Sequence, residues 1–86
     1  MMDEEKVLKF LRCPASGLVE FALEMANLTW KESTAIQLCG RQAMTQARAA
    51  EKIGYSEDVM QKWYRSGMNK LVQLWSGVWW IQKIIE

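Results

Sequence analysis

The segment from Met44 to Leu71 constrains the fold most strongly, because its residues predict two short helices joined by a tight turn. Thr45 can cap the first helix by accepting a hydrogen bond from an orphan amide. Gly54 can end that helix, since glycine adopts positive φ at little steric cost, and Ser56 can cap the next one. This order is typical of a helix-turn-helix, although an ordinary helical hairpin has the same spacing, so both interpretations stay open.

The rest of the composition favours helices as well. The chain has 86 residues, enough for one domain with a modest core. It holds a single proline and five glycines, and it lacks the long apolar–polar alternation that marks strands. We therefore expect an all-α fold in which residues 1–86 form one domain. The expected architecture is a small bundle of four to five helices that contains the helix-turn-helix at residues 44–71.

Two helices are predicted near the N-terminus. The first covers residues 3–12, and the second begins with Ser16 as its N-cap and ends at Asn27. Apolar residues that repeat at i, i+3, i+4 and i+7 predict the core face of the second helix. These residues are Leu18, Phe21, Ala22 and Met25.

A third helix is predicted from a capping box, in which Thr29 and Glu32 each satisfy an amide at the other end of the first turn. The pattern fades near Gly40. Further along the chain, Gly67 falls inside the second helix of the helix-turn-helix, where glycine costs about 1 kcal/mol relative to alanine. It indicates either a kink or the close approach of a large side chain such as Trp30.

Positive charge gathers on the helix-turn-helix. The net charge of the chain is only +1, but residues 41–70 hold six basic and three acidic side chains. Contacts to nucleic-acid phosphates would require such an excess. A solvated helical surface can carry the same excess, so the charge supports nucleic-acid binding without deciding it.

The C-terminal segment, residues 71–86, has ten apolar residues among sixteen. It predicts a long Trp-rich helix, or one that is broken at Ser76–Gly77. Because the apolar residues cover more than one helical face, two interpretations stay open: closure of the core and a surface for a partner. A homodimer through this tail would suit a palindromic DNA site, and a membrane span is not expected from so short a run. The candidate interface residues are Trp75, Trp79, Trp80 and Ile84.

Enzymatic, cofactor and metal functions have little support. The chain has no histidine and no glycine-rich phosphate loop after a strand, and Cys13 and Cys39 alone do not fill a zinc site. Asp3, Glu4 and Glu5 stand where a secretory signal would carry basic residues. We therefore expect a cytoplasmic protein that is not an enzyme and binds no cofactor or metal.

A second pattern runs without a gap from Leu28 to Leu71. Its members are Leu28–Thr29 with Glu32, then Ala35, Ile36 and Leu38, then Met44–Thr45, then Ala50, Ile53, Gly54 and Ser56 around the turn, and finally Met60, Met68 and Leu71. These residues resemble the fourth conserved region of bacterial sigma factors, the part that reads a promoter element, and the small sigma-like regulators of bacteriophages and other mobile elements. The resemblance implies a DNA-binding transcription regulator with RNA polymerase as a further partner.

The sequence departs from that family pattern at several positions. Trp30 replaces the usual proline after Leu28–Thr29, and Gly40 stands where a bulky residue is common. Glu57 and Asp58 occupy the first exposed positions of the recognition helix, where the family commonly has a basic and an acidic residue. These departures leave open the base contacts and the packing of the first helix of the helix-turn-helix, which we call the brace helix.

The candidate DNA-contacting residues are Thr45, Gln46, Arg48, Ser56, Glu57, Asp58, Gln61, Lys62 and Arg65. Gln61 can pair with adenine, and the carboxylates of Glu57 and Asp58 can accept from cytosine. Lys62 and Arg65 suit phosphates, as do the brace-helix residues. Capping and complementing the helix dipole is an equal interpretation for the two acids, and an ordinary solvated face is the alternative for the two bases.

Two hypotheses follow from these residues. The favoured one is a sequence-specific transcription regulator of sigma-like type that binds double-stranded DNA. The alternative is a protein-interaction module, an adaptor or inhibitor that uses the helix-turn-helix scaffold and the Trp-rich tail to bind a host protein. The target sequence, the sign of regulation and the oligomeric state stay open.

Overall fold

The structure, a computed structural model, describes residues 2–85 and consists of helices and turns in that range. The elements are α1 (Glu4–Leu11), α2 (Ser16–Ala26), α3 (Trp30–Ala35), η1 (Ile36–Arg41), α4 (Gln46–Ile53), α5 (Glu57–Trp75) and α6 (Trp79–Ile85). The all-α prediction is confirmed. Six α-helices occur in the described range, where four or five were expected, because the C-terminal segment is broken. Residues 1 and 86, which the predicted domain included, lie outside the described residues.

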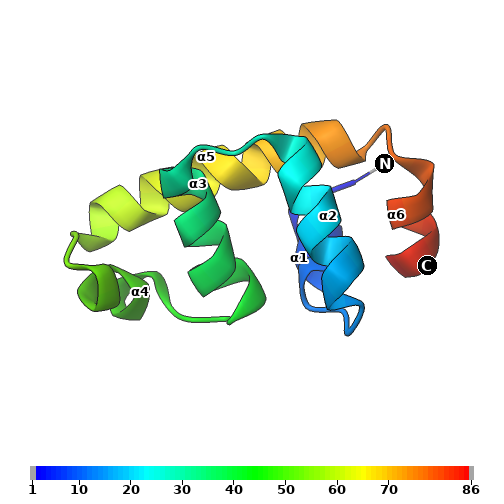
Figure 1. Cartoon of the computed structure of the whole chain (residues 1–86). Coiled ribbons are helices and arrows are strands. Elements are labelled where there is room, and N and C mark those ends of the chain that lie inside the picture. The colour runs from blue at the N-terminus through cyan, green and yellow to red at the C-terminus, as the bar shows by residue number, and fades with distance from the viewer. Residues whose placement is uncertain (1, 86) are drawn as a thin grey trace.

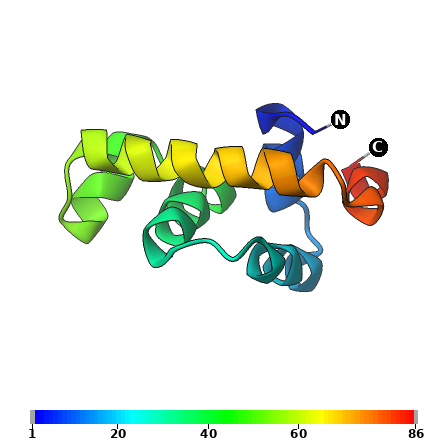
Figure 2. The same cartoon turned by 90° about the horizontal axis from the view of Figure 1, so that it is seen from above.

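Helix α5 runs along the upper edge of the molecule, and the other helices lie beneath it (Figure 1). Towards its N-terminal end it packs on α3, η1 and α4, and towards its C-terminal end on α1, α2 and α6. Seen from above, α5 crosses in front of the other helices (Figure 2). One side of α5 therefore faces outward along the length of the molecule.

The core consists of two hydrophobic clusters that α5 connects. The larger cluster joins α1, α2, α6 and the C-terminal half of α5, and its largest fully buried side chains include Phe10, Leu71, Trp75 and Ile81. The smaller cluster lies under the helix-turn-helix and consists of Ala35, Leu38, Cys39, Ala49, Ala50 and Met60. Tyr64 packs against both clusters.

The ends of the helix-turn-helix helices agree with the sequence prediction. The Thr45 hydroxyl accepts a hydrogen bond from the Arg48 amide at 3.2 Å. Gly54 ends α4 with a φ of 78°, a left-handed conformation that other residues adopt only with strain. The Ser56 hydroxyl accepts from the Val59 amide at 3.3 Å. The two helices and the turn are thus confirmed, and the second helix continues to Trp75.

Helix α2 corrects the prediction for its core face. Of the four predicted residues, Ala22 is buried as expected, whereas Leu18, Phe21 and Met25 are exposed and a neighbouring apolar row that includes Ala22 is buried instead. That row consists of Val19, Ala22 and Leu23. The sequence carries two apolar rows, and contacts with distant helices decide which one is covered. Ser16 is also the first helical residue and not the N-cap, since Ala15 holds that position without a side-chain hydrogen bond. The predicted end at Asn27 is confirmed.

The helix that begins at Trp30 changes to π-helical turns over Ile36–Arg41. A Cβ atom at Gly40 would lie 3.0 Å from the Leu11 side chain, and the Arg12 Nε atom donates to the Gly40 carbonyl at 2.8 Å. The predicted fading near Gly40 therefore marks a place where η1 comes close to the C-terminal end of α1.

Glu32 fastens α3 to α5. Its carboxylate accepts from the Thr29 amide at 3.0 Å, and the Glu32 amide donates to the Thr29 hydroxyl at 3.2 Å, so the predicted capping box is confirmed. The carboxylate also accepts from the Ser66 hydroxyl and, at 2.7 Å, from the Lys70 ammonium. Burial alone would raise the pKa of Glu32, but the hydrogen bonds from Lys70, Ser66 and Thr29 lower that pKa to about 2.

Gly67 allows this close contact between α3 and α5. A Cβ atom there would lie 3.0 Å from Ile36 Cγ1 and 3.3 Å from Glu32 Cβ. The sequence left two alternatives open at Gly67, a kink in the helix and the close approach of a large side chain. Helix α5 is continuous through Gly67, so the close approach is the outcome. The residues that approach are Ile36 and Glu32, not Trp30.

We predict that Gly67→Ala destabilises the fold. Alanine gains about 1 kcal/mol of helix propensity over glycine, but forcing a methyl group against a fully buried Ile36 costs about 1–3 kcal/mol, so the expected net loss is about 1 kcal/mol in urea unfolding. Gly17→Ala on α2 is the matched control, because nothing lies within 4 Å of a Cβ there. Equal or higher stability of Gly67→Ala would contradict the packing argument.

The C-terminal segment breaks at Ser76–Gly77, as one of the two predictions stated, and α6 then folds back beneath α5. Among the four predicted interface residues, the prediction for Trp75 is wrong. Its side chain is fully buried and packs edge-on against Phe10 at 5.0 Å between ring centroids. Trp80 is half-buried, whereas Trp79 is 72% exposed and Ile84 is 38% exposed. None of the described helices meets the length and apolarity that a membrane span requires.

Candidate nucleic-acid interface

The N-terminal half of α5 presents its predicted contact residues on the outward side. Asp58, Gln61, Lys62 and Arg65 are exposed and together line a shallow hollow of about 290 Å³. None of them lies beneath the Trp-rich C-terminal segment, which packs at the other end of α5. The spacing of three and four residues places them on adjoining positions of one helical face. This face carries two cationic, one amide and one acidic side chain.

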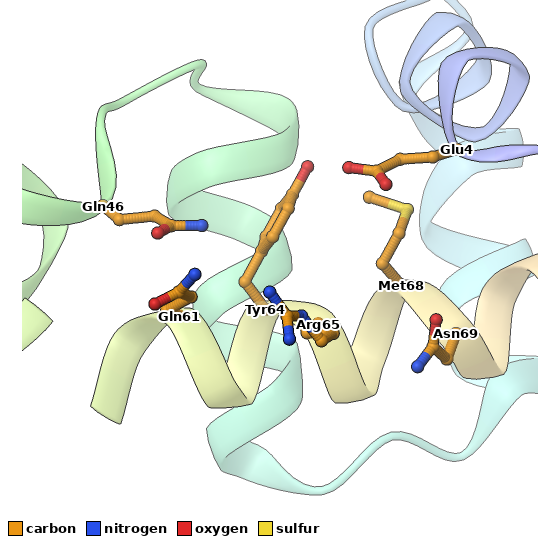
Figure 3. A pocket seen from close by; sticks show the side chains of 7 residues that line it. All are labelled: Glu4, Gln46, Gln61, Tyr64, Arg65, Met68 and Asn69. Carbon is orange, nitrogen blue, oxygen red and sulfur yellow. The ribbon is translucent and has the colours of Figure 1, made fainter. Parts of the chain in front are cut away.

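A second hollow, of about 150 Å³, lies on one flank of this face, where α5 meets α1 and α4. Gln46 of α4 lies across it from Gln61 of α5, and Arg65 lies further along α5 (Figure 3). The structure thus brings the brace-helix residue Gln46 together with two predicted residues of α5.

Glu4 reaches the same hollow from α1, and its carboxylate points toward Tyr64 (Figure 3). Burial, and to a smaller extent the charge of Glu4, raise the pKa of Tyr64, so its phenol stays protonated to a higher pH than an ordinary tyrosine and can donate a hydrogen bond. Sequence reasoning missed both residues at this site, because α1 is separated from α5 by about half the chain and no local pattern pairs them.

The remaining predicted residues lie at the ends of α4 and α5. Thr45 and Arg48 line an open surface of α4 together with Lys52. The Thr45 and Ser56 hydroxyls accept capping hydrogen bonds from helix amides, so each oxygen is already engaged with the backbone. Glu57 and Asp58 occupy the first turn of α5, where negative charge complements the helix dipole.

The opposite flank of α5 carries an aromatic cluster that the sequence did not predict. Trp30, at the start of α3, packs against Trp63 at 5.6 Å between ring centroids, and Tyr55 of the turn packs against the same ring at 4.8 Å. The Lys31 ammonium lies 5.7 Å from the Trp30 ring centroid and 5.8 Å from that of Trp63, within the range of cation–π attraction. Trp30 is nevertheless 61% exposed.

Within residues 2–85, the structure contains no group of three or more potential metal ligands from histidine, cysteine, aspartate and glutamate. Both cysteines are free, and burial raises the pKa of Cys39.

No family model, curated protein or solved structure matches the chain.

Proposed function

We propose that this chain is a sequence-specific DNA-binding transcription regulator of sigma region 4-like type. The observation that supports it best is the uncovered outward face of α5 with Asp58, Gln61, Lys62 and Arg65. A recognition helix must expose such a face over its N-terminal half to enter the major groove of a duplex. The resemblance of residues 28–71 to the sigma region adds RNA polymerase as a proposed partner.

The residues take different roles in this proposal. Gln61 reads a base edge, for which a glutamine amide matches adenine, and the Asp58 carboxylate accepts from a cytosine amino group. Lys62 and Arg65 contact phosphates. Gln46 contacts the DNA backbone on the flank where it lies close to Gln61, and Arg48 contacts the DNA backbone from the open surface of α4.

The charge of the chain makes the phosphate contacts decisive. With a net charge of +1 over the whole sequence, long-range attraction to DNA is weak, so affinity depends on a few local cations. Each phosphate contact contributes about 0.9 to the slope of log affinity against log salt. A protein with few contacts therefore shows a shallow slope in which the loss of two is measurable.

We predict that replacing both Lys62 and Arg65 by alanine weakens duplex binding at least about tenfold and lowers the salt slope by about 2. The duplex is first obtained by selection from a random pool, and affinity is measured by fluorescence anisotropy at several salt concentrations. The matched control replaces Lys6 and Lys9 of α1, which removes the same charge from another surface. Equal binding by the wild type and the Lys62/Arg65 variant would sink the proposal, as would failure of selection to enrich any duplex.

A second function, binding of a host protein, is favoured by the exposed Trp30 and Tyr55 side chains beside α5. Aromatic residues are enriched in the centres of protein interfaces. The distinguishing result is the absence of a shift with random duplex at low salt, together with a protein retained in a pull-down and lost on Trp30→Ala.

A further inference from the structure

An apolar face lies at the end of the molecule away from α4 and the N-terminal half of α5. Leu18, Phe21 and Met25 of α2 and Trp80 and Ile84 of α6 form it, and we name it the α2–α6 face. The two helices lie side by side beneath the C-terminal end of α5 (Figures 1 and 2). They meet where the Phe21 and Trp80 rings lie 6.3 Å apart.

Packing inside the chain leaves much of this face uncovered. Phe21 is 54% exposed, and Leu18, Met25 and Ile84 are also exposed. Single apolar side chains on a surface are common, but a continuous group that spans two helices marks an interaction surface. The same chain covers the other apolar row of α2 completely at Val19 and Ala22, so the exposed row is not needed for the core.

The charges at the two edges of this face are complementary. Glu20 and Glu24 lie on α2 at the edge away from α6, since Glu20 pairs with Arg41 of η1 on that side. Lys83 lies at the opposite edge, on the outer side of α6 that it shares with Trp79. Within residues 2–85, neither Glu24 nor Lys83 forms an ion pair.

We propose that a second copy of this chain covers the α2–α6 face in a two-fold symmetric dimer whose axis runs parallel to α2 and α6. Rotation about that axis brings the acidic edge of each copy against the basic edge of the other, so Glu24 faces Lys83 twice. Apolar side chains fill the centre and charged ones form the rim, as in other protein interfaces. The sequence suggested a homodimer through the C-terminal tail, and the proposed dimer is instead centred on Phe21.

The same axis suits DNA binding, a consequence that rests on the proposed function. Helix α5 lies across the upper ends of α2 and α6 (Figure 1). Rotation about an axis parallel to those two helices therefore leaves the outward faces of both α5 helices on one side of the dimer. Two recognition helices can then approach one duplex from the same direction, as a palindromic site requires.

Sedimentation velocity without DNA tests the dimer by itself. The wild-type protein should dimerise, and Phe21→Asp and Lys83→Glu should each weaken the dimer at least about tenfold, because the first buries a carboxylate and the second places like charges together. The double variant Glu24→Lys with Lys83→Glu exchanges the charges of these two residues between the edges and should restore the dimer. Lys52→Glu on α4, an exposed lysine at the other end of the molecule, is the matched control and should dimerise as the wild type does.

Circular dichroism checks that each variant is folded, which is expected because every changed side chain is exposed. A wild-type protein that stays monomeric at every concentration overturns the dimer. So does a dimer that survives both single changes, or a charge exchange that fails to restore it. None of these outcomes affects the proposed function, which the binding of selected duplexes by the Lys62 and Arg65 variants tests separately.

Discussion

Trp75→Ala should lower the free energy of unfolding by about 3–5 kcal/mol, the range for removing a large aromatic side chain from a core. Trp75 is fully buried and is among the largest side chains of the larger cluster, where it packs edge-on against Phe10 at 5.0 Å between ring centroids. For a domain of this size the loss corresponds to a midpoint temperature about 12–40 °C lower. Urea unfolding followed by far-ultraviolet circular dichroism measures it.

Trp75→Phe is the matched control for this change. It keeps a ring against Phe10 and removes the indole N–H, which is buried and has no hydrogen-bond partner in the described part of the chain. No hydrogen bond is lost, so the expected cost is only that of the smaller ring, about 1–2 kcal/mol. A loss below about 1 kcal/mol for Trp75→Ala would mean that Trp75 does not hold the α1, α5 and α6 cluster together.

Acid should remove about 3 kcal/mol of stability through Glu32 alone. The pKa of its carboxyl is lowered from 4.5 to about 2 in the folded protein, where Lys70, Ser66 and Thr29 donate to it. A lowered pKa means that the stabilisation is complete above pH 4.5 and is lost as the pH falls through about 2. Urea unfolding at a series of pH values follows this loss.

Glu32→Gln separates this effect from the titration of the other acids. The amide cannot ionise, so the stability difference between the wild type and the variant should shrink by about 3 kcal/mol between pH 5 and pH 2. Glu20→Gln is the control, since the Glu20 side chain is 54% exposed beside Arg41 and exposed ion pairs contribute little. A difference for Glu32→Gln that does not change with pH would show that the carboxylate charge is not what fastens α3 to α5.

The features that the sequence could predict are those set by neighbouring residues. The caps at Thr45 and Ser56, the left-handed Gly54 and the capping box at Thr29 each depend on residues no more than four positions apart. Hydroxyl caps and glycine C-caps act through the adjacent backbone, so they need no knowledge of the rest of the fold.

The features that the sequence could not predict depend on distant partners. Ser66 and Lys70 reach Glu32 from 34 and 38 residues away, and neither spacing follows from a helical period. Helix α2 carries two apolar rows, and only its docking against the rest of the core decides that Phe21 stays outside. The close approach of Gly40 in η1 to Leu11 of α1 likewise joins residues that are far apart in the sequence.

The candidate site divides in the same way. Asp58, Gln61, Lys62 and Arg65 share one face because their spacing is helical, and the sequence predicted that face. Glu4 and Trp30 flank α5 from other helices, and only the fold brings them there. The residues that flank α5 could therefore not be predicted from the sequence.

Helix α5 has 19 residues in one unbroken run, so it is a rod about 28 Å long. One end bears the face that we propose to contact a duplex, and the other is anchored by Trp75 beside the α2–α6 face. A straight, rigid helix transmits a change of tilt. A partner that binds at the anchored end therefore also sets the angle of the free end, without any rearrangement of the residues between them. If both proposals hold, recognition of DNA and binding of the second copy would then be mechanically coupled.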